Sequence, residues 1–144
     1  MATQNYANHR QMVPMFHLVL LPVLGLTLIG SVVNLVKSWG EHSRIYSASL
    51  IVVLTIATIM LSFLIRIFAL KAQDRAIRAE ENLRHFAMAG KLLDPRLTIG
   101  QVIALRFASD GEFLALSKKA ADEATAPDDI KRSVQEWRAD TYRV

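Results

Sequence analysis

The stretch MLSFLIRIFALKAQDRAIRAEENLRH, Met60–His85, begins as an apolar run and ends as a series of charged residues. Neither Gly nor Pro interrupts the chain between Ser47 and Gly90, and the part after Arg66 is rich in residues that favour helix. The charged part also offers two (i, i+4) ion pairs, Asp74–Arg78 and Glu80–Arg84. The stretch therefore predicts one continuous helix, roughly 65 Å long, that leaves a membrane without ending.

Two apolar blocks, Leu18–Val36 and Ser47–Ile65, contain no acidic or basic residue. Each is close to the roughly 20 residues that cross a bilayer, and the first lacks the features of a cleaved signal peptide. We therefore expect an all-α membrane protein: a two-helix transmembrane hairpin, with the second helix extended into the cytoplasm and a small C-terminal helical head. The expected segments are an N-terminal cytoplasmic segment (1–12), transmembrane helix 1 (13–36), a periplasmic loop (37–46), transmembrane helix 2 with its extension (47–93) and a three-helix head (94–144).

The basic residues indicate the orientation of the two spans. Six lie on the side of the two chain termini, before the first span or after the second, and two, Lys37 and Arg44, lie in the loop between the spans. Because basic residues favour the cytoplasmic side, we expect both termini in the cytoplasm of a bacterial inner membrane. The net charge of +4 does not indicate nucleic-acid binding, since residues 97–144 contain seven basic and eight acidic residues. The six are Arg10, Arg66, Lys71, Arg75, Arg78 and Arg84.

Four residues are expected at the membrane interfaces. Trp39 and Tyr46 flank the outer ends of the spans, where an aromatic ring with one polar atom is favoured. Arg66 and Lys71 follow the second span, where a long stem can lie along lipid while the charge reaches water.

Mostly small residues recur at alternating steps of three and four along the second helix. Such a repeat keeps one face against a neighbouring helix, and hydroxyls can bond across it. In the membrane the first span offers a matching stripe from His17 to Asn34. Beyond the membrane the partner must be the C-terminal tail, a second copy or another protein. This interaction seam comprises Thr55, Thr58, Ser62, Ala69, Ala72, Ala76, Ala79, Leu83 and Phe86.

The residues after Gly90 predict three short helices. Thr98 can cap the first, Ser109 and Glu112 form a capping box for the second, and Pro127 begins the third, predicted through Asp140. The three helices together have fewer than 50 residues, too few for a substantial core of their own. We therefore expect this head to pack on Ala72–Phe86. The predicted head core includes Ile130, Val134 and Trp137.

The sequence offers no catalytic or metal-binding constellation. There is no cysteine, and the four histidines are scattered. Only His17 lies near membrane depth, where a haem or chlorophyll ligand would be needed, and we interpret it as an interfacial polar residue. We expect no cofactor and no enzymatic activity. The final TYRV, Thr141–Val144, is either a recognition tag or a frayed end.

Four phrases carry a family resemblance: QNYANH (4–9), FALKAQDRAIRAEENLRHF (68–86), LTIGQVIALRFASD (97–110) and IKRSVQEWRADTYRV (130–144). Together they resemble an uncharacterised bacterial family of two-span inner-membrane proteins, a domain of unknown function. The resemblance covers nearly the whole chain. It implies an inner-membrane protein of about this length and supplies no activity or site residue.

We expect a non-catalytic accessory or scaffold subunit of an inner-membrane complex, such as a respiratory or photosynthetic one. Its partners would be the lipid bilayer and other membrane-protein subunits. One alternative is a self-assembling homo-oligomer joined through Ala72–Leu83. A third hypothesis is a membrane-bound enzyme or ligand sensor that uses the head.

Overall fold

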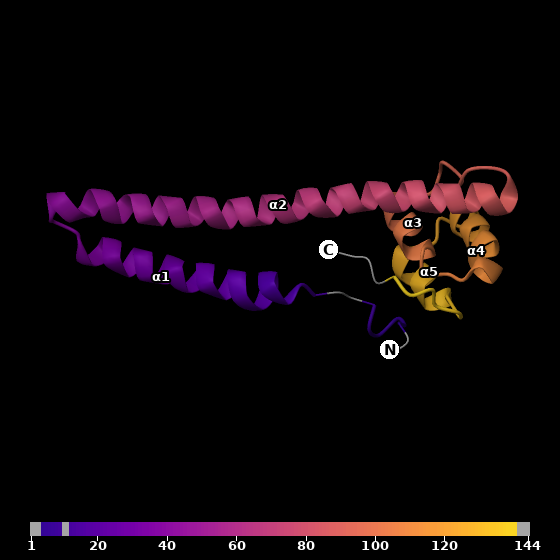
Figure 1. Ribbon diagram of the computed structural model, residues 1–144, viewed down its shortest axis with the longest axis horizontal. Coiled ribbons are helices and arrows are strands. Elements are labelled where there is room, and N and C mark those ends of the chain that lie inside the picture. The colour runs from indigo at the N-terminus through magenta and orange to yellow at the C-terminus, as the bar shows by residue number, and fades with distance from the viewer. Residues whose placement is uncertain (1–3, 10–11, 141–144) are drawn as a thin grey trace. The chain divides into compact units, whose positions relative to one another are not determined.

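The computed structural model describes residues 4–9 and 12–140 (Figure 1). The chain divides into two compact units. The unit Met12–Ala69 is called the apolar unit, and the C-terminal unit comprises Met1–Gln11 with Leu70–Val144. The elements, in chain order, are η1 (Met15–Leu20), α1 (Leu21–Lys37), α2 (His42–Ala89), α3 (Ile99–Leu105), α4 (Asp110–Asp122) and α5 (Pro127–Ser133).

Helix α2 is unbroken over 48 residues, which confirms the expected passage of one helix from apolar to charged sequence. Its limits differ from the predicted 47–93. It begins five residues earlier, so part of the predicted loop is helical, and it ends four residues earlier. Gly40 and Gly90 flank it with φ of +97° and +69°, values that glycine adopts without a steric penalty.

Two helices are long and apolar enough to cross a membrane. They are Met15–Lys37 and His42–Ala89, with mean hydropathy of 2.3 and 2.6 in their most apolar windows. The first begins with the wide turns of η1, which end just before Pro22. Because proline has no N–H and its ring crowds the carbonyl four residues back, a wider turn is favoured there.

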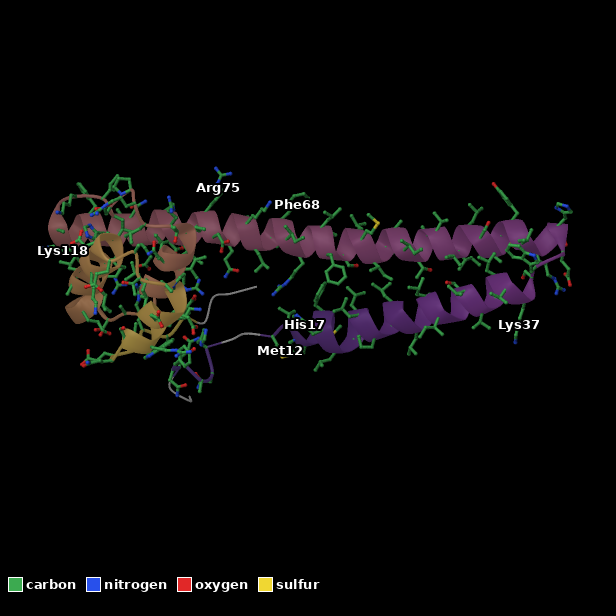
Figure 2. All side chains as sticks on the ribbon, turned by 180° about the vertical axis from the view of Figure 1, so that it is seen from behind. Met12, His17, Lys37, Phe68, Arg75 and Lys118 are labelled. Carbon is green, nitrogen blue, oxygen red and sulfur yellow. The ribbon has the colours of Figure 1, made fainter. Side chains whose placement is uncertain are left out.

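Within the apolar unit few residues are buried. Ser31, Ala48 and Thr55 are nearly inaccessible, whereas most Leu, Ile and Val side chains of both helices are exposed. The Phe16 and Phe63 rings meet edge to face, with centroids 6.3 Å apart. Figure 2 shows side chains projecting outward along these helices, including Phe68, which is exposed. An apolar exterior of this kind suits a lipid environment.

The C-terminal unit has a compact apolar core. Val102, Leu105, Phe107 and Phe113 are its largest fully buried side chains. The predicted core residues Ile130 and Val134 belong to the same cluster, and Trp137 packs against it while remaining partly exposed.

The predicted capping residues of α3 and α4 are confirmed. The Thr98 hydroxyl accepts from the Gln101 backbone N–H, and the Gln101 side chain accepts from the Thr98 N–H. Ser109 and Glu112 form the corresponding capping box at the start of α4. At the N-terminus of each of these two helices, the capping box satisfies backbone N–H groups that have no acceptor within the helix.

The third predicted helix is shorter than expected. Helix α5 stops at Ser133, and Val134 is extended, with φ −66° and ψ 119°. The Glu112 carboxylate accepts the backbone N–H groups of Gln135 and Glu136, and Trp137 forms an antiparallel bridge with Ala108. These distant partners offer the backbone hydrogen bonds that a longer helix would have supplied.

Candidate functional site

One face of α2 packs into the C-terminal unit. Ile77, Glu81 and His85 recur every four residues and are 7%, 4% and 7% exposed. The His85 Nδ1–H donates to the Lys91 carbonyl at 2.6 Å, and its ring meets Phe113 edge-on. The spacing places these residues on a single face, which we call the packed face.

Arg84 makes the main polar connection of the packed face. Its Nη1 donates to Glu81 Oε2 at 3.0 Å, and its Nη2 donates to the Ala108 carbonyl at 2.8 Å. Nε and Nη2 both donate to Asp110 Oδ1, and the guanidinium lies 4.1 Å from the centroid of the Phe113 ring. Both Arg84 and Glu81 are almost inaccessible to solvent, so these contacts hold charge in a dry environment.

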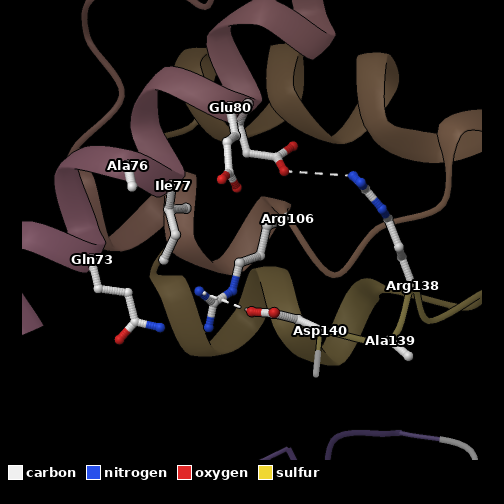
Figure 3. Close-up of a pocket in the computed structure, with 9 residues that line it drawn as sticks. Gln73, Ala76, Ile77, Glu80, Arg106, Arg138, Ala139 and Asp140 are labelled. Atoms are coloured by element: carbon white, nitrogen blue, oxygen red, sulfur yellow. Dashed lines mark ion pairs between the residues drawn. The ribbon is translucent and has the colours of Figure 1, made fainter. Parts of the chain in front are cut away.

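A charged pocket of about 340 Å³ adjoins the packed face (Figure 3). Arg106 pairs with Asp140 at 3.1 Å, and Arg138 pairs with Glu81 at 3.6 Å. Basic and acidic side chains are thus paired within the pocket. The arrangement is suited to joining α2 to the residues after α5. The remaining lining residues are Gln73, Ala76, Ile77, Glu80 and Ala139.

The opposite face of α2 is open. Ala72, Ala76 and Ala79 are exposed, and Leu83 and Phe86 are 68% and 52% exposed. At ~100° per residue these five residues lie across the helix from the packed face. We call them the open face.

The C-terminal unit thus contacts the stretch Ala72–Phe86 of α2, but not through the exposed seam residues Ala72, Ala79 and Leu83. The C-terminal unit instead uses the packed face, where Ile77 offers more apolar area than an alanine. Glu81 and His85 on that face find hydrogen-bond partners in the unit. The sequence contains a second four-residue period, formed by Ile77, Glu81 and His85. It was not recognised as a buried face because two of these three residues are polar.

Two charged residues border the open face. Arg75 and Glu80 are both exposed, and neither takes part in an ion pair with another described residue. The predicted Glu80–Arg84 pair is replaced, because Arg84 turns to Glu81 and Asp110.

The other predicted helix pair is also absent from the described part of the chain. Asp74 and Arg78 form no ion pair there, and Arg78 Nη2 donates to the Leu97 carbonyl at 3.0 Å. A carbonyl beyond the end of α2 competes with the neighbouring carboxylate for this arginine.

The seam residues from Thr55 to Ala69 differ in their exposure to solvent. Thr55 is buried, Ser62 and Ala69 are half-buried, and Thr58 is exposed. The Thr55, Thr58 and Ser62 hydroxyls each donate at 2.8 Å to the carbonyl four residues earlier in α2. In the structure these hydroxyls donate to carbonyls of their own helix.

The N-terminal segment, residues 4–9, docks on α5 and on the residues after it. The Tyr6 hydroxyl donates to Asp128 Oδ2 at 2.7 Å and accepts from Arg132 Nε at 3.1 Å. The buried His9 ring lies 5.8 Å from both the Phe107 and Trp137 rings. Sequence reasoning missed this contact, since six residues without helical periodicity give no local signal of a distant partner.

Two carboxyl groups of the C-terminal unit have lowered pKa values. Hydrogen bonds from the Arg96 side chain and backbone lower the pKa of Asp94 to about 2. The Tyr6 hydroxyl lowers the pKa of Asp128, with a smaller contribution from Arg132. In both cases a donor favours the ionised form of the carboxyl group.

The remaining predicted residues lie apart from one another. Trp39 and Tyr46 are 78% and 71% exposed, Lys71 is exposed, and the Arg66 guanidinium lies 5.8 Å from the Phe16 ring centroid.

His17, the candidate pigment or haem ligand, donates from Nδ1 to the Val13 carbonyl at 2.9 Å, and its ring meets Phe16 edge-on. Among the described residues, no three His, Asp or Glu side chains gather in a metal-binding group. The TYRV end lies outside the described residues.

Fold and site together define an all-helical protein with two helices that could span a membrane and an open helix face beside a packed C-terminal unit. The chain belongs to a protein family of unknown function, DUF6526, whose model matches residues 1–144. No curated protein and no solved structure matches it.

Proposed function

We propose that this protein is a non-catalytic scaffold subunit of the bacterial inner membrane. In this proposal η1 with α1, and the first part of α2, form a transmembrane hairpin. The Phe16–Phe63 contact and the buried Ser31 and Thr55 support such pairing. The part of α2 after Arg66 then leaves the bilayer and carries the C-terminal unit.

The contact between Tyr6 and Asp128 supports a membrane topology with an even number of spans. Residues that share a hydrogen bond occupy the same side of the bilayer, so the chain between them crosses it an even number of times. Two apolar helices separate them, in agreement with a hairpin. The excess of basic residues beyond the second span supports a cytoplasmic position for that side.

The open face of α2 is the observation on which the scaffold function depends. Ala72, Ala76 and Ala79 allow close approach of another helix, and the exposed Leu83 and Phe86 supply apolar area to bury. The C-terminal unit packs on the other side of α2 and reaches the open face only at Ala76, which lines the charged pocket but is exposed. The scaffold thus holds a partner helix at the cytoplasmic surface of the membrane.

The test is gentle solubilisation of native membranes in a mild detergent. The chain should migrate in an assembly larger than the monomer, and Ala79→Glu should release it, because the new charge would be buried against the partner. Ala115→Glu, the same change at an exposed position of α4, should leave the assembly intact. A monodisperse wild-type monomer would contradict the proposal.

A further inference from the structure

We infer that the helix bound by the open face is α2 of a second copy of this chain, aligned in parallel and in register. The inference rests on the scaffold function proposed above and names its partner. It follows from the heptad positions of the residues on α2 and from the two charges that border the open face.

The five open-face residues fit the inner positions of a heptad repeat. Ala76 and Leu83 take position a, while Ala72, Ala79 and Phe86 take position d, the two positions that face a partner helix in a coiled coil. The packed-face residues fall on the outer positions b, c and f. A partner at a and d would therefore meet α2 away from its packed face. Ala76 at a and Glu80 at e also line the charged pocket, so the partner would lie beside the C-terminal unit there.

The charges beside this seam are complementary for a parallel pair of identical helices. Arg75 takes position g and Glu80 the following position e, the two positions that form ion pairs between parallel strands. In register, Arg75 of each copy faces Glu80 of the other, which gives two symmetric ion pairs. The other bordering positions are uncharged, so no like charges oppose each other: Phe68, Gln73, Asn82 and Ala87.

These two residues are available for such pairing. They are five positions apart, about 140° around the helix, and so cannot pair with each other within one α2. Both are exposed and form no ion pair with another described residue. Copies inserted with the same membrane orientation present α2 helices that run in the same direction, which favours the parallel arrangement over an antiparallel one.

Cysteine crosslinking in native membranes tests the contact. The chain contains no cysteine, so single substitutions report one position each. Ala79→Cys should link two copies, shown by a product that contains both tags when two differently tagged chains are co-expressed. Met88→Cys, at an exposed position on the other side of α2, should not.

A charge exchange tests the pairing in the Ala79→Cys background. Arg75→Glu and Glu80→Arg should each lower the crosslinked yield by about fivefold, and the double variant should restore it, because the two pairs are then rebuilt with reversed sign. Lys118→Glu makes the same change in charge as Arg75→Glu at an exposed position of α4, outside the seam, and should leave the yield unchanged. Restoration in the double variant also shows that the substituted chains still fold.

Two kinds of result would overturn the inference, and they differ in what they say of the scaffold function. An Ala79→Cys product that joins the chain to a different protein, or a double variant no better than the single ones, would exclude a second copy and leave the scaffold function standing. Absence of an Ala79→Cys crosslink between two copies would exclude the second copy alone, whereas a monodisperse wild-type monomer after gentle solubilisation would exclude both.

Discussion

Arg84 of α2 and Asp110 at the start of α4 form a short ion pair, in which Nε and Nη2 donate to the same carboxylate oxygen at 2.8 and 2.6 Å. Asp110 is largely exposed, whereas Arg84 is nearly inaccessible. The arginine therefore extends its charge from the buried packed face to a carboxylate at the surface. This contact joins α2 to α4.

Arg84→Ala should destabilise the C-terminal unit by about 3–5 kcal/mol, because it removes the closest partner of the buried Glu81 carboxylate. Urea unfolding of the detergent-solubilised chain, followed by Trp137 fluorescence in a Trp39→Phe background, measures the change. Arg75→Ala is the matched control, since that exposed arginine of the same helix should alter the stability of the unit by less than about 0.5 kcal/mol. Equal effects of the two variants would contradict the packed-face assignment.

Substitutions of two leucines, one buried and one exposed, distinguish residues that stabilise the core from residues that bind the partner. Leu105→Ala should cost about 2–5 kcal/mol in the same unfolding experiment, since its side chain is fully buried. Leu83→Ala should leave the unfolding of the monomer nearly unchanged and weaken the larger assembly instead. A large loss of monomer stability in Leu83→Ala would show that the open face belongs to the core.

Asp94 should titrate well below an ordinary aspartate. Its pKa falls from 3.8 to about 2 through hydrogen bonds from Arg96. The folded-state pKa is the lower one, so the ionised carboxylate contributes stability above about pH 4, which is lost as the pH falls through about 2. Carboxyl ¹³C shifts recorded against pH give the value directly, and Arg96→Ala should return it toward 3.8. An unchanged midpoint in that variant would refute the assigned cause.

One hydroxyl group ties the N-terminal segment to α5. Tyr6→Phe removes the donor to Asp128 and should raise the pKa of that carboxyl toward its ordinary value. Hydrogen exchange in residues 4–9 should become faster, because the segment loses a tether to α5. The same substitution at the exposed Tyr46 should change neither quantity. Unaltered exchange in Tyr6→Phe would show that the other contacts of the segment hold it, such as the ring contacts of His9 and the Gln4 side chain, which accepts from the Asp140 N–H.

Local signals predicted much of the fold. The apolar blocks, the absence of Gly and Pro after Ser47, and the capping residues Thr98 and Ser109 each act within a few residues, and the helices follow them. The end of α5 could not be predicted in this way. It depends on Glu112, a residue more than 20 positions away, which accepts from the backbone after Val134.

The seam was identified from its period, but its partner was not. Periodicity shows which residues share a face, and it does not show which of two faces a neighbouring unit will bury. Ile77, Glu81 and His85 also share a face, and their polar groups are acceptable inside only because Arg84 and the Lys91 carbonyl pair with them. Such pairing is a tertiary property, so it becomes visible only in the structure.

The occupancy of the open face is the central claim, and the rate of cysteine modification measures it most directly. Single cysteines at Ala72, Ala79, Leu83 and Met88 are treated with a water-soluble maleimide, once in native membranes and once in detergent that yields the monomer. The three open-face positions should react much more slowly in membranes than in detergent, whereas Met88→Cys should react equally fast in both. Equal rates at all four positions would contradict the account, because they would show that no helix covers this face.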